Sequence, residues 1–357
     1  MKQRFKKHLN KLERLRMPEH PDWRTNLLLN RNERVIPYAE KTIESLLARL
    51  AKVQLNQYPD MDIFYKKLAR HLAIRENQIY ITEGVSGGIK AILETLAKKG
   101  DNVVFPVPTF ALYPVYCRMF DVLPKTVGYK KDYKLDLGDL KKLIDRKTAV
   151  VFLPNPNVPI EGTLNLGDIA LLAEYCRRKG AFLAIDEVYF PFGGPTAKPL
   201  IDKFNNIFLM RSFSKAFGLA GIRVGYVMSD KKNIEYISKM RTGYEANSLS
   251  MEVASFFIDH YDIVESYVKD VKGGFKYLKE ELDKIWVEYN GGDTSNFLYI
   301  NIKNKENAKR ISKKLKANGI HIRTGWPEPY DGGILVTGGP KYVMERFFII
   351  FKEALKK

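Results

Sequence analysis

The chain has 357 residues, of which 45% are hydrophobic and 12% aromatic, and its formal net charge is +18. This length exceeds what one hydrophobic core usually serves, so we expect two domains within one folded unit, and the apolar content argues against disorder. The two cysteines are too few for a disulfide framework, and no apolar run reaches the ~18 residues that span a bilayer. We therefore expect a cytoplasmic protein with reduced thiols and no membrane partner.

The positive charge is dispersed along helical faces, as in residues 275–285 and 308–319. A nucleic-acid-binding protein usually gathers its basic residues in one arm or patch. We therefore expect no nucleic-acid partner, and a phosphorylated, acidic small molecule accounts for the charge more simply. The five histidines lack the spacing of metal ligands, so no metal site is expected.

The predicted elements begin with residues 1–40, where Pro18, Pro21 and Pro37 indicate an arm and part of a small domain. In residues 41–255, short apolar runs alternate with helical segments such as 87–100 and 166–180. The strand-like runs are residues 77–82, 101–107, 148–154, 181–188, 206–213 and 222–229. Strands that are apolar on both faces and joined by helices predict an α/β class fold, with a three-layer α/β/α large domain around a mostly parallel sheet.

The pattern changes toward the C-terminus. A helical pattern over roughly residues 232–282 is expected to bridge two domains, and residues 256–357 are expected to form the smaller α+β domain. Its strand-like runs are residues 296–302, 319–325 and 333–339.

Candidate functional residues follow the strand-like runs, where open parallel sheets bind their ligands. The turn after the first run offers the backbone amides of Val85, Ser86 and Gly87 to an anion, although tight packing explains such a turn equally well. Asp186 ends a hydrophobic run, and a carboxylate buried there is costly unless a cation such as a protonated pyridine nitrogen pairs with it. The alternative is that Asp186 only caps the next turn. The Asn-rich turn at residues 155–157 could offer a side-chain amide, or serve only as a turn.

Residues 211–226, RSFSKAFGLAGIRVGY, carry the most informative lysine. Apolar neighbours surround Lys215, and such neighbours desolvate an amine and lower its pKa, as a Schiff-base lysine requires. Ser212, Ser214 and Arg223 supply hydroxyls and a guanidinium that suit a phosphate. A lysine that merely reaches out of a buried loop to water is the alternative.

The order of these motifs resembles the fold-type I pyridoxal-phosphate aminotransferases, in particular the branch of histidinol-phosphate aminotransferase and threonine-phosphate decarboxylase. The order is a phosphate-binding turn, the Pro-Thr-Phe turn at residues 108–110, the Asn turn, the Asp strand, and then the lysine with its serines and arginine. The resemblance extends from LLLNRNER at residues 27–34 to GILVTGGP at residues 333–340, which is nearly the whole chain.

The resemblance implies that pyridoxal 5'-phosphate is the cofactor. It implies that Lys215 forms the Schiff base and moves the proton, that Asp186 keeps the pyridine nitrogen protonated, and that Tyr189 binds the ring hydroxyl. It also implies that Phe110 stacks on the ring. The implied phosphate-binding residues are Val85, Ser86, Gly87, Ser212, Ser214 and Arg223, together with Tyr58 reaching across a homodimer.

Three departures from the family pattern concern the ring hydroxyl and the substrate. Val158 stands where the family's ring-hydroxyl asparagine is commonest, so we expect Asn157 to take over that contact. Ile334 stands where the family has the arginine that binds the substrate α-carboxylate, whereas Arg323 matches an arginine that recognises the substrate, often its phosphate. The opening LNRNER departs from the family's usual sequence and is expected to bring Asn32 and Glu33 to the substrate mouth.

A retained Arg323 and a missing carboxylate arginine favour an aminotransferase that acts on a small keto phosphate, such as a three-carbon one. LNRNER also resembles branch members thought to serve surface-polysaccharide assembly. The alternatives are a decarboxylase of a phosphorylated amino acid such as phosphoserine, and histidinol-phosphate aminotransferase. A regulatory module that binds the cofactor without turnover is a further hypothesis, which the presence of Lys215, Asp186 and Tyr189 disfavours.

Overall fold

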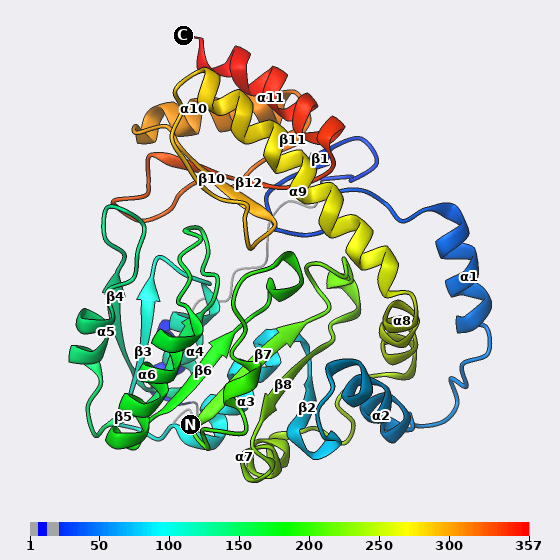
Figure 1. Cartoon of the computed structure of the whole chain (residues 1–357), viewed down its shortest axis with the longest axis vertical. Helices are drawn as coiled ribbons and strands as arrows, with labels where there is room; N and C mark the ends of the chain where they lie inside the picture. The colour runs from blue at the N-terminus through cyan, green and yellow to red at the C-terminus, as the bar shows by residue number, and fades with distance from the viewer. Residues whose placement is uncertain (1–5, 13–20, 357) are drawn as a thin grey trace, which may run out of the picture.

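The computed structural model describes residues 6–12 and 21–356, and its larger part is built on a seven-stranded sheet (Figure 1). The strand order is β2-β8-β7-β6-β5-β3-β4, and β8 alone runs against the others. The bounds are β2 (Ile79–Thr82), β3 (Asn102–Val107), β4 (Leu123–Gly128), β5 (Thr148–Pro154), β6 (Phe182–Asp186), β7 (Ile207–Ser212) and β8 (Gly225–Ser229). The predicted mostly parallel sheet is confirmed.

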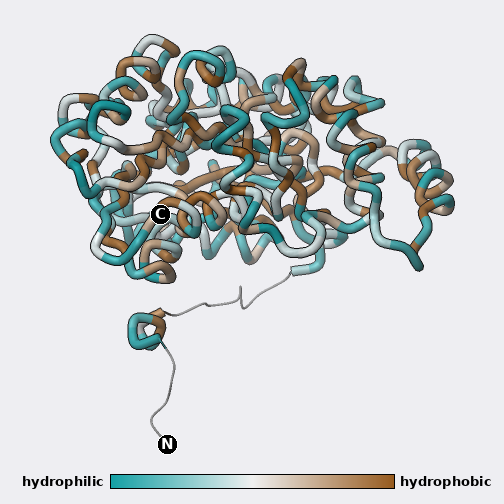
Figure 2. The backbone as a smooth tube through the Cα atoms, turned by 90° about the horizontal axis from the view of Figure 1, so that it is seen from below, coloured by the Kyte–Doolittle hydropathy of each residue, from teal (hydrophilic) through white to brown (hydrophobic). Residues whose placement is uncertain are grey.

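Helices cover both faces of this sheet. Successive strand residues point to opposite sides, so the inner strands present apolar side chains on both faces, and helices pack on each. Val103 and Val150 lie in one apolar cluster, and Val104 and Val151 lie in the other. The first cluster includes residues of α3 (Gly84–Leu96), α4 (Leu112–Phe120) and α7 (Lys231–Ile237), and the second those of α2 (Met61–Leu72), α5 (Leu137–Leu143) and α6 (Leu166–Lys179). Figure 2 shows apolar backbone positions concentrated inside the molecule. The predicted three-layer α/β/α arrangement is confirmed.

Two elements differ from the sequence-based expectation. The edge strand β4 was not predicted, because its exposed and partly buried residues lack the apolar run of the inner strands. The pattern over residues 232–282 forms three helices instead of one, namely α7, α8 (Ser248–Asp259) and α9 (Tyr261–Lys284). Residues 241–247 are not helical, and Asn247 ends this break by accepting a hydrogen bond from the Ser250 backbone N–H at 2.8 Å, as a helix N-cap does.

The smaller part lies at the top of Figure 1, and α9 runs into it from the larger part. It holds the antiparallel sheet β12-β10-β9 and two further helices. The bounds are β9 (Tyr289–Gly291), β10 (Phe297–Asn301), β12 (Gly333–Thr337), α10 (Lys305–Ala317) and α11 (Lys341–Leu355). Of the strand-like run at residues 319–325, only β11 (Ile320–His321) is a strand, and it pairs with β1 (Leu27–Leu28) from the N-terminal segment.

The N-terminal segment contacts both parts of the molecule. Residues 6–12 contain a short 3₁₀ helix (Lys7–Lys11), in which the His8 ring lies 3.2 Å from the Met119 carbonyl oxygen. Pro18 and the stretch 13–20 lie outside the described residues. After β1 the chain crosses to α1 (Glu40–Leu50), at the right-hand edge of Figure 1. The domain boundaries after residues 40 and 255 stay a prediction.

Glu161 connects the two parts through a single carboxylate. It follows β5, and its side chain accepts hydrogen bonds from the backbone N–H groups of Gly292, Asp293 and Thr294 at 2.8, 3.1 and 2.8 Å. The Ser295 hydroxyl also donates to it. Consecutive backbone N–H groups of this kind form a natural anion site. The loop after β5 is therefore fastened to the loop before β10.

Helix α9 offers a matched pair of glycines for a stability test. A Cβ at the buried Gly274 would lie 1.9 Å from the carbonyl oxygen of Gly339, whereas a Cβ at the exposed Gly273 would meet nothing within 4 Å. We expect Gly274→Ala to lower the free energy of unfolding by about 2 kcal/mol or more, because backbone must move. Gly273→Ala should raise it by ~0.5–1 kcal/mol through helix propensity. Urea unfolding of both variants measures this, and equal effects would contradict the packing of α9 against residue 339.

Candidate active site

A cavity of about 280 Å³ lies at the carboxyl ends of β5, β6 and β7. Polar strand-end residues collect there because parallel strands end at one edge of the sheet. Twelve of the residues that the sequence singled out line it: Asn32, Glu33, Val85, Ser86, Phe110, Asp186, Tyr189, Ser212, Ser214, Lys215, Arg223 and Arg323.

Three of the predicted residues do not line this cavity. Gly87 lies one residue farther into α3, where a Cβ would face Thr82 and Glu83 at 3.3 Å. Asn157 is fully buried, and its amide is engaged by the Pro-Thr-Phe turn at residues 108–110: Thr109 Oγ1 donates to Oδ1 at 2.8 Å, and Nδ2 donates to the Pro108 carbonyl at 2.7 Å. Tyr58 is 81% exposed and lines a separate depression beside α1.

Hydroxyl and guanidinium groups gather at one end of the cavity. Ser212 Oγ donates to Ser214 Oγ at 2.8 Å, and Arg223 Nη2 donates to Ser86 Oγ at 3.2 Å. Helix α3 begins here at Gly84, and no side chain caps its first turn. The open amides, the positive end of the helix dipole and the guanidinium together form an anion site.

Two glycines permit this end to be so compact. Gly84 has φ +68°, and a Cβ there would lie 2.9 Å from Arg223 Nη2. A Cβ at Gly225 would lie 2.6 Å from the Gly84 carbonyl carbon, so β8 and the start of α3 touch backbone to backbone. Glycine is required at both positions, because any side chain would separate Arg223 from the helix N-terminus.

Lys215 stands in the middle of the cavity and is partly buried. Its Nζ donates to the Arg31 carbonyl oxygen at 3.0 Å, and burial lowers the pKa of the amine to about 8. The N-terminal segment also holds the backbone around the lysine, since the Tyr38 hydroxyl donates to the Phe217 carbonyl oxygen. A lysine with a lowered pKa supplies the neutral amine that a covalent step at a carbonyl carbon requires.

Asp186 faces the cavity from the end of β6 and is almost fully buried. Its Oδ2 accepts a hydrogen bond from the Tyr113 hydroxyl at 2.9 Å, and its Oδ1 accepts one from the Val188 N–H at 3.1 Å. Burial raises the pKa of this carboxyl to about 6, although both hydrogen bonds oppose that rise. The group is therefore poised to pair with a cation in the cavity.

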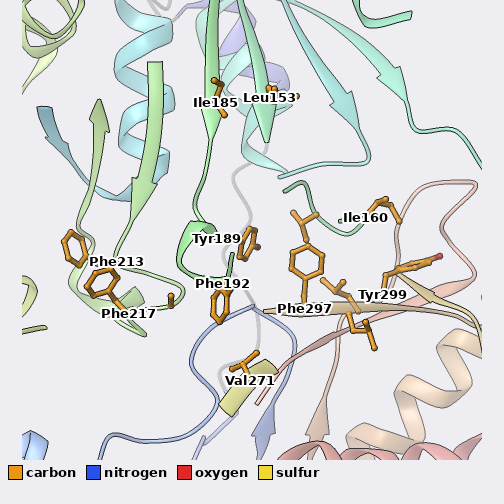
Figure 3. Packing of buried hydrophobic residues seen from close by; sticks show 14 of the residues in the cluster. Leu153, Ile160, Ile185, Tyr189, Phe192, Phe213, Phe217, Val271, Phe297 and Tyr299 are labelled. Carbon is orange, nitrogen blue, oxygen red and sulfur yellow. The ribbon is translucent and has the colours of Figure 1, made fainter. Parts of the chain in front are cut away.

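Tyr189 follows Asp186 in the turn after β6, and it lies beside Phe192 and Phe297 in Figure 3. Its ring meets that of Phe297 at 5.2 Å and 72°, and its hydroxyl accepts a hydrogen bond from Asn32 Nδ2 at 2.9 Å. The Asn32 backbone N–H donates in turn to Thr337 Oγ1 at 2.9 Å. This chain of hydrogen bonds orients the phenol and brings the N-terminal segment to the cavity wall.

A buried ion pair supports the two strands that carry Asp186 and Ser212. Arg211 Nη2 and Nε donate to Glu187 Oε2 at 2.8 and 3.1 Å, and both side chains are almost entirely buried. Glu187 Oε1 also accepts a hydrogen bond from the Ala197 N–H at 2.6 Å. The pair fixes the ends of β6 and β7 relative to each other without facing the cavity.

Charged residues of both signs line the opposite end of the cavity. Arg323 follows β11, exchanges two backbone hydrogen bonds with Leu335 of β12, and holds its guanidinium 4.3 Å from the Trp326 ring centroid. Ile334 is fully buried, pairs with Ile300 in the small sheet, and does not line the cavity. The position that the resemblance assigns to a carboxylate-binding arginine therefore gives this cavity no cation.

Sequence reasoning missed several residues at the site. Arg31, Gly84 and Val188 line the cavity, and Tyr113 donates a hydrogen bond to Asp186. Arg31, Gly84 and Val188 adjoin motifs that the sequence singled out, so their positions could have been found from those motifs. Tyr113 gives no such indication, because a tyrosine near the start of an apolar helix is usually core.

Metal and membrane features are not found in residues 6–12 and 21–356. No three histidine, cysteine or acidic side chains in this part are grouped so that they could bind a metal ion. No helix in it is long and apolar enough to cross a membrane. His20 lies outside the described residues.

The arrangement fits a flat pyridine ring that carries an aldehyde and one phosphate. The anion end formed by Ser86, Ser212, Ser214 and Arg223 suits the phosphate, and Lys215 offers an amine to the aldehyde. Asp186 offers a carboxylate to the ring nitrogen, because it is buried and lines the cavity.

The chain matches the sequence model of the family "Aminotransferase class I and II" over residues 22–334. Among its relatives, histidinol-phosphate aminotransferase of Caldanaerobacter subterraneus subsp. tengcongensis is 30% identical over 305 residues, which cover 83% of each chain. The enzyme of the same name from Pyrococcus furiosus is 27% identical over 331 residues, which cover 92% of each chain.

Solved structures share the fold. Histidinol-phosphate aminotransferase of Sinorhizobium meliloti in complex with pyridoxal-5'-phosphate superposes with a TM-score of 0.88 at 22% identity, covering 98% of this chain and 97% of that one. L-Threonine-O-3-phosphate decarboxylase of Porphyromonas gingivalis superposes with a TM-score of 0.78 at 19% identity, covering 93% of this chain and 100% of that one.

The lowered pKa of Lys215 predicts a pH-dependent cost to folding. The unfolded chain binds more protons than the folded one between pH 8 and the usual pKa of 10.5, so stability rises with pH across that interval. We expect Lys215→Met to raise the free energy of unfolding of the ligand-free protein by ~2 kcal/mol at pH 7, with the gain vanishing toward pH 10.5. Urea unfolding at several pH values measures this.

The exposed Lys203 is the matched control, since Lys203→Met removes a lysine that does not line the cavity. A gain from Lys215→Met that stays constant from pH 7 to 10.5 would show that the amine is not desolvated.

Proposed function

Because this chain belongs to the class I and II aminotransferase family and is a pyridoxal-phosphate-dependent aminotransferase, we propose that its substrate is a small keto phosphate without a carboxylate, such as a three-carbon one. The similar proteins named for histidinol phosphate support a phosphorylated substrate. One observation carries the finer proposal: Arg323 lines the cavity, whereas Ile334 is fully buried outside it. A phosphate finds a guanidinium at this end, and an α-carboxylate lacks its usual bidentate partner.

Glu33 supports a substrate without a carboxylate. It lines the cavity, and of the charged groups that raise the pKa of Lys215 it has the largest effect, ahead of Asp186. An ionised Glu33 near the lysine repels an α-carboxylate placed there, and it accepts a hydrogen bond from a substrate hydroxyl at the same place. A keto phosphate with a hydroxymethyl group matches both preferences.

In the proposed chemistry, different residues of the chain have different roles. When it is bound, the cofactor supplies an electron sink that stabilises negative charge on the substrate carbon. Lys215 binds the cofactor covalently and then moves the proton at that carbon, for which its lowered pKa suits it. Asp186 holds the pyridine nitrogen protonated, Tyr189 binds the ring hydroxyl, and Phe110 packs on the ring face.

Two alternative functions would use the same cofactor-binding residues. A decarboxylase of a phosphorylated amino acid such as phosphoserine is compatible with the threonine-phosphate decarboxylase fold, but that substrate carries a carboxylate beside Glu33. Histidinol-phosphate aminotransferase is supported by the names of the relatives, which share about 30% of their residues with this chain. A part in surface-polysaccharide assembly rests on the LNRNER opening alone.

The homodimer is also a proposal, and it rests on an exposed apolar face. Leu47, Leu55, Tyr58 and Ile63 are between 58% and 81% exposed on α1, α2 and the segment that joins them. Clustered apolar side chains of this kind are typical of a subunit interface. The Tyr58 ring stacks on Tyr244 at 4.7 Å, and we propose that it reaches the anion end of a second copy.

The substrate proposal predicts a preference that kinetics can measure. The enzyme should aminate dihydroxyacetone phosphate with a higher kcat/KM than phosphohydroxypyruvate, which adds a carboxylate, across a panel of amino donors. Arg323→Ala should lower kcat/KM for the keto phosphate by ~10–100-fold, chiefly through KM, because a charge-assisted contact is lost. Arg178→Ala on α6 is the control, because Arg178 does not line the cavity. Preference for phosphohydroxypyruvate, or carbon dioxide release from phosphoserine without an acceptor, would overturn the proposal.

A shared site predicts complementation between two inactive variants. Lys215→Ala and Tyr58→Ala should each be nearly inactive, but in a mixed dimer one of the two sites regains both residues. Co-expression with two affinity tags should therefore restore about a quarter of the wild-type activity to the unfractionated dimers. Hybrid dimers that form and stay inactive would show that Tyr58 does not serve the partner's site.

A further inference from the structure

Tyr113 is a fully buried tyrosine that no part of the proposed chemistry uses. Its ring stacks on Phe152 of β5 at 5.0 Å and 24°, and it lies 5.7 Å from Phe105 of β3. Phe110, on the cavity wall, meets it edge-on at 6.0 Å and 90°. These aromatic neighbours from two strands and one turn fix the position of the ring.

The hydroxyl is the one polar atom of this side chain, and it points to Asp186. Tyr113 Oη donates to Asp186 Oδ2 at 2.9 Å, while Oδ1 of the same carboxylate accepts from the Val188 N–H. The carboxylate thus has one fixed donor on each oxygen and keeps its remaining lone pairs toward the cavity that it lines. A side chain held at both oxygens cannot rotate away from the cavity.

We propose that Tyr113 is a positioning residue that keeps Asp186 ionised and aimed at the pyridine nitrogen of the cofactor. The inference rests on the proposed role of Asp186 at that nitrogen. It assigns Tyr113 no contact with the cofactor itself, because Tyr113 acts through the carboxylate.

Physical chemistry shows why such a residue is needed. Burial raises the pKa of Asp186 to about 6, and the Tyr113 hydrogen bond is the largest influence that opposes it. Of the other charged groups near this carboxylate, Lys215 across the cavity lowers its pKa and Glu187 on the same strand raises it, and Glu187 is already paired with Arg211. A hydrogen bond to an ionised group shifts an ionisation equilibrium by ~tenfold, so at pH 7 the protonated fraction of Asp186 would rise from about one tenth to about one half without Tyr113.

The donor itself stays protonated. Burial, together with the charge of Asp186, holds the pKa of Tyr113 well above its usual value. The phenol is therefore a permanent donor at every pH at which the carboxylate titrates. Phe110, which packs on the face of the cofactor ring in the proposed function, contacts the Tyr113 ring edge-on. Tyr113 therefore supports both Asp186 and Phe110.

A core-filling tyrosine and a positioning tyrosine make different predictions for Tyr113→Phe. Loss of a core hydrogen bond lowers stability equally at every pH. Loss of a donor to an ionised carboxylate raises the folded pKa of Asp186 further above its unfolded value. Because stability is lost as pH rises through a raised folded pKa, the deficit of the variant should then be small at pH 4, grow between pH 6 and 7, and level off.

The experiment measures urea unfolding of the full chain, stripped of cofactor, from pH 4 to 8. The variants are Tyr113→Phe, Asp186→Asn, the double variant, and Tyr299→Phe as the matched control. Tyr299 is equally buried and donates its hydrogen bond to the Tyr330 carbonyl oxygen at 3.0 Å instead of to a carboxylate. We expect a pH-dependent deficit for Tyr113→Phe alone, which vanishes in the Asp186→Asn background, and a pH-independent deficit for Tyr299→Phe.

Binding of pyridoxal phosphate to the same variants gives a second readout. Tyr113→Phe should raise the equilibrium dissociation constant by ~threefold at pH 6.5 and leave it nearly unchanged at pH 8.5, where Asp186 is ionised in both proteins. A deficit that is the same at every pH, or that persists in the Asp186→Asn background, would overturn the proposal. If Tyr113→Phe fails to fold, a pH-independent effect of Asp186→Asn in the wild-type background would overturn it instead.

These experiments test the role of Tyr113 independently of the proposed substrate. A pH-dependent deficit in a protein that aminates no keto phosphate would leave the role of Tyr113 intact and reject the substrate. The reverse result would reject Tyr113 alone.

Discussion

The structure depends on keeping an amine and a carboxylate, both desolvated by burial, in one cavity. Burial lowers the pKa of Lys215 to about 8 and raises that of Asp186 to about 6, so each charge costs folding energy that its surroundings must offset. The offset is local: the Arg31 carbonyl accepts from the amine, and Tyr113 and the Val188 N–H donate to the carboxylate. The sheet places these groups together because β6 and β7 are parallel neighbours. Asp186 ends β6, and Lys215 lies in the turn that follows β7 at the same edge.

The fold and the cofactor end could be predicted from the sequence because their determinants are local. Inner strands are continuous apolar runs, and a ligand residue that follows such a run lies at the strand end by geometry. The edge strand β4 lacks such a run, and the break at residues 241–247 was overlooked although Asn247, the N-cap of α8, marks its end. Asn157 was expected at the ring, but its amide bonds to Thr109 and Pro108, which only the folded turn brings near. Tyr113 was missed for the same reason, since its partner is 73 residues away.

At the substrate end, one position carries a different residue from the one that the family resemblance implies, while the fold is kept. Ile334 is an ordinary inward residue of β12, and its neighbour Leu335 forms the backbone bridge that places Arg323. Trp326 faces the guanidinium of Arg323 and limits the directions that it can take. In the proposed function, specificity at this end is set by which position carries the cation and by Glu33, which lines the same cavity, while the smaller sheet keeps the architecture of the relatives.

The contact of Glu161 with residues 292–295 has a mechanical consequence. Four donors from the smaller part meet one carboxylate from the loop that carries Pro156 and Val158 into the cavity wall. Such a contact holds the loop firmly, because several hydrogen bonds would have to break together before the loop could move away. Glu161 does not act alone, because the Tyr133 hydroxyl donates to Glu288 and the Tyr189 ring packs on Phe297 across the same boundary. The position of the cavity wall that Pro156 and Val158 form is therefore tied to that of the smaller sheet.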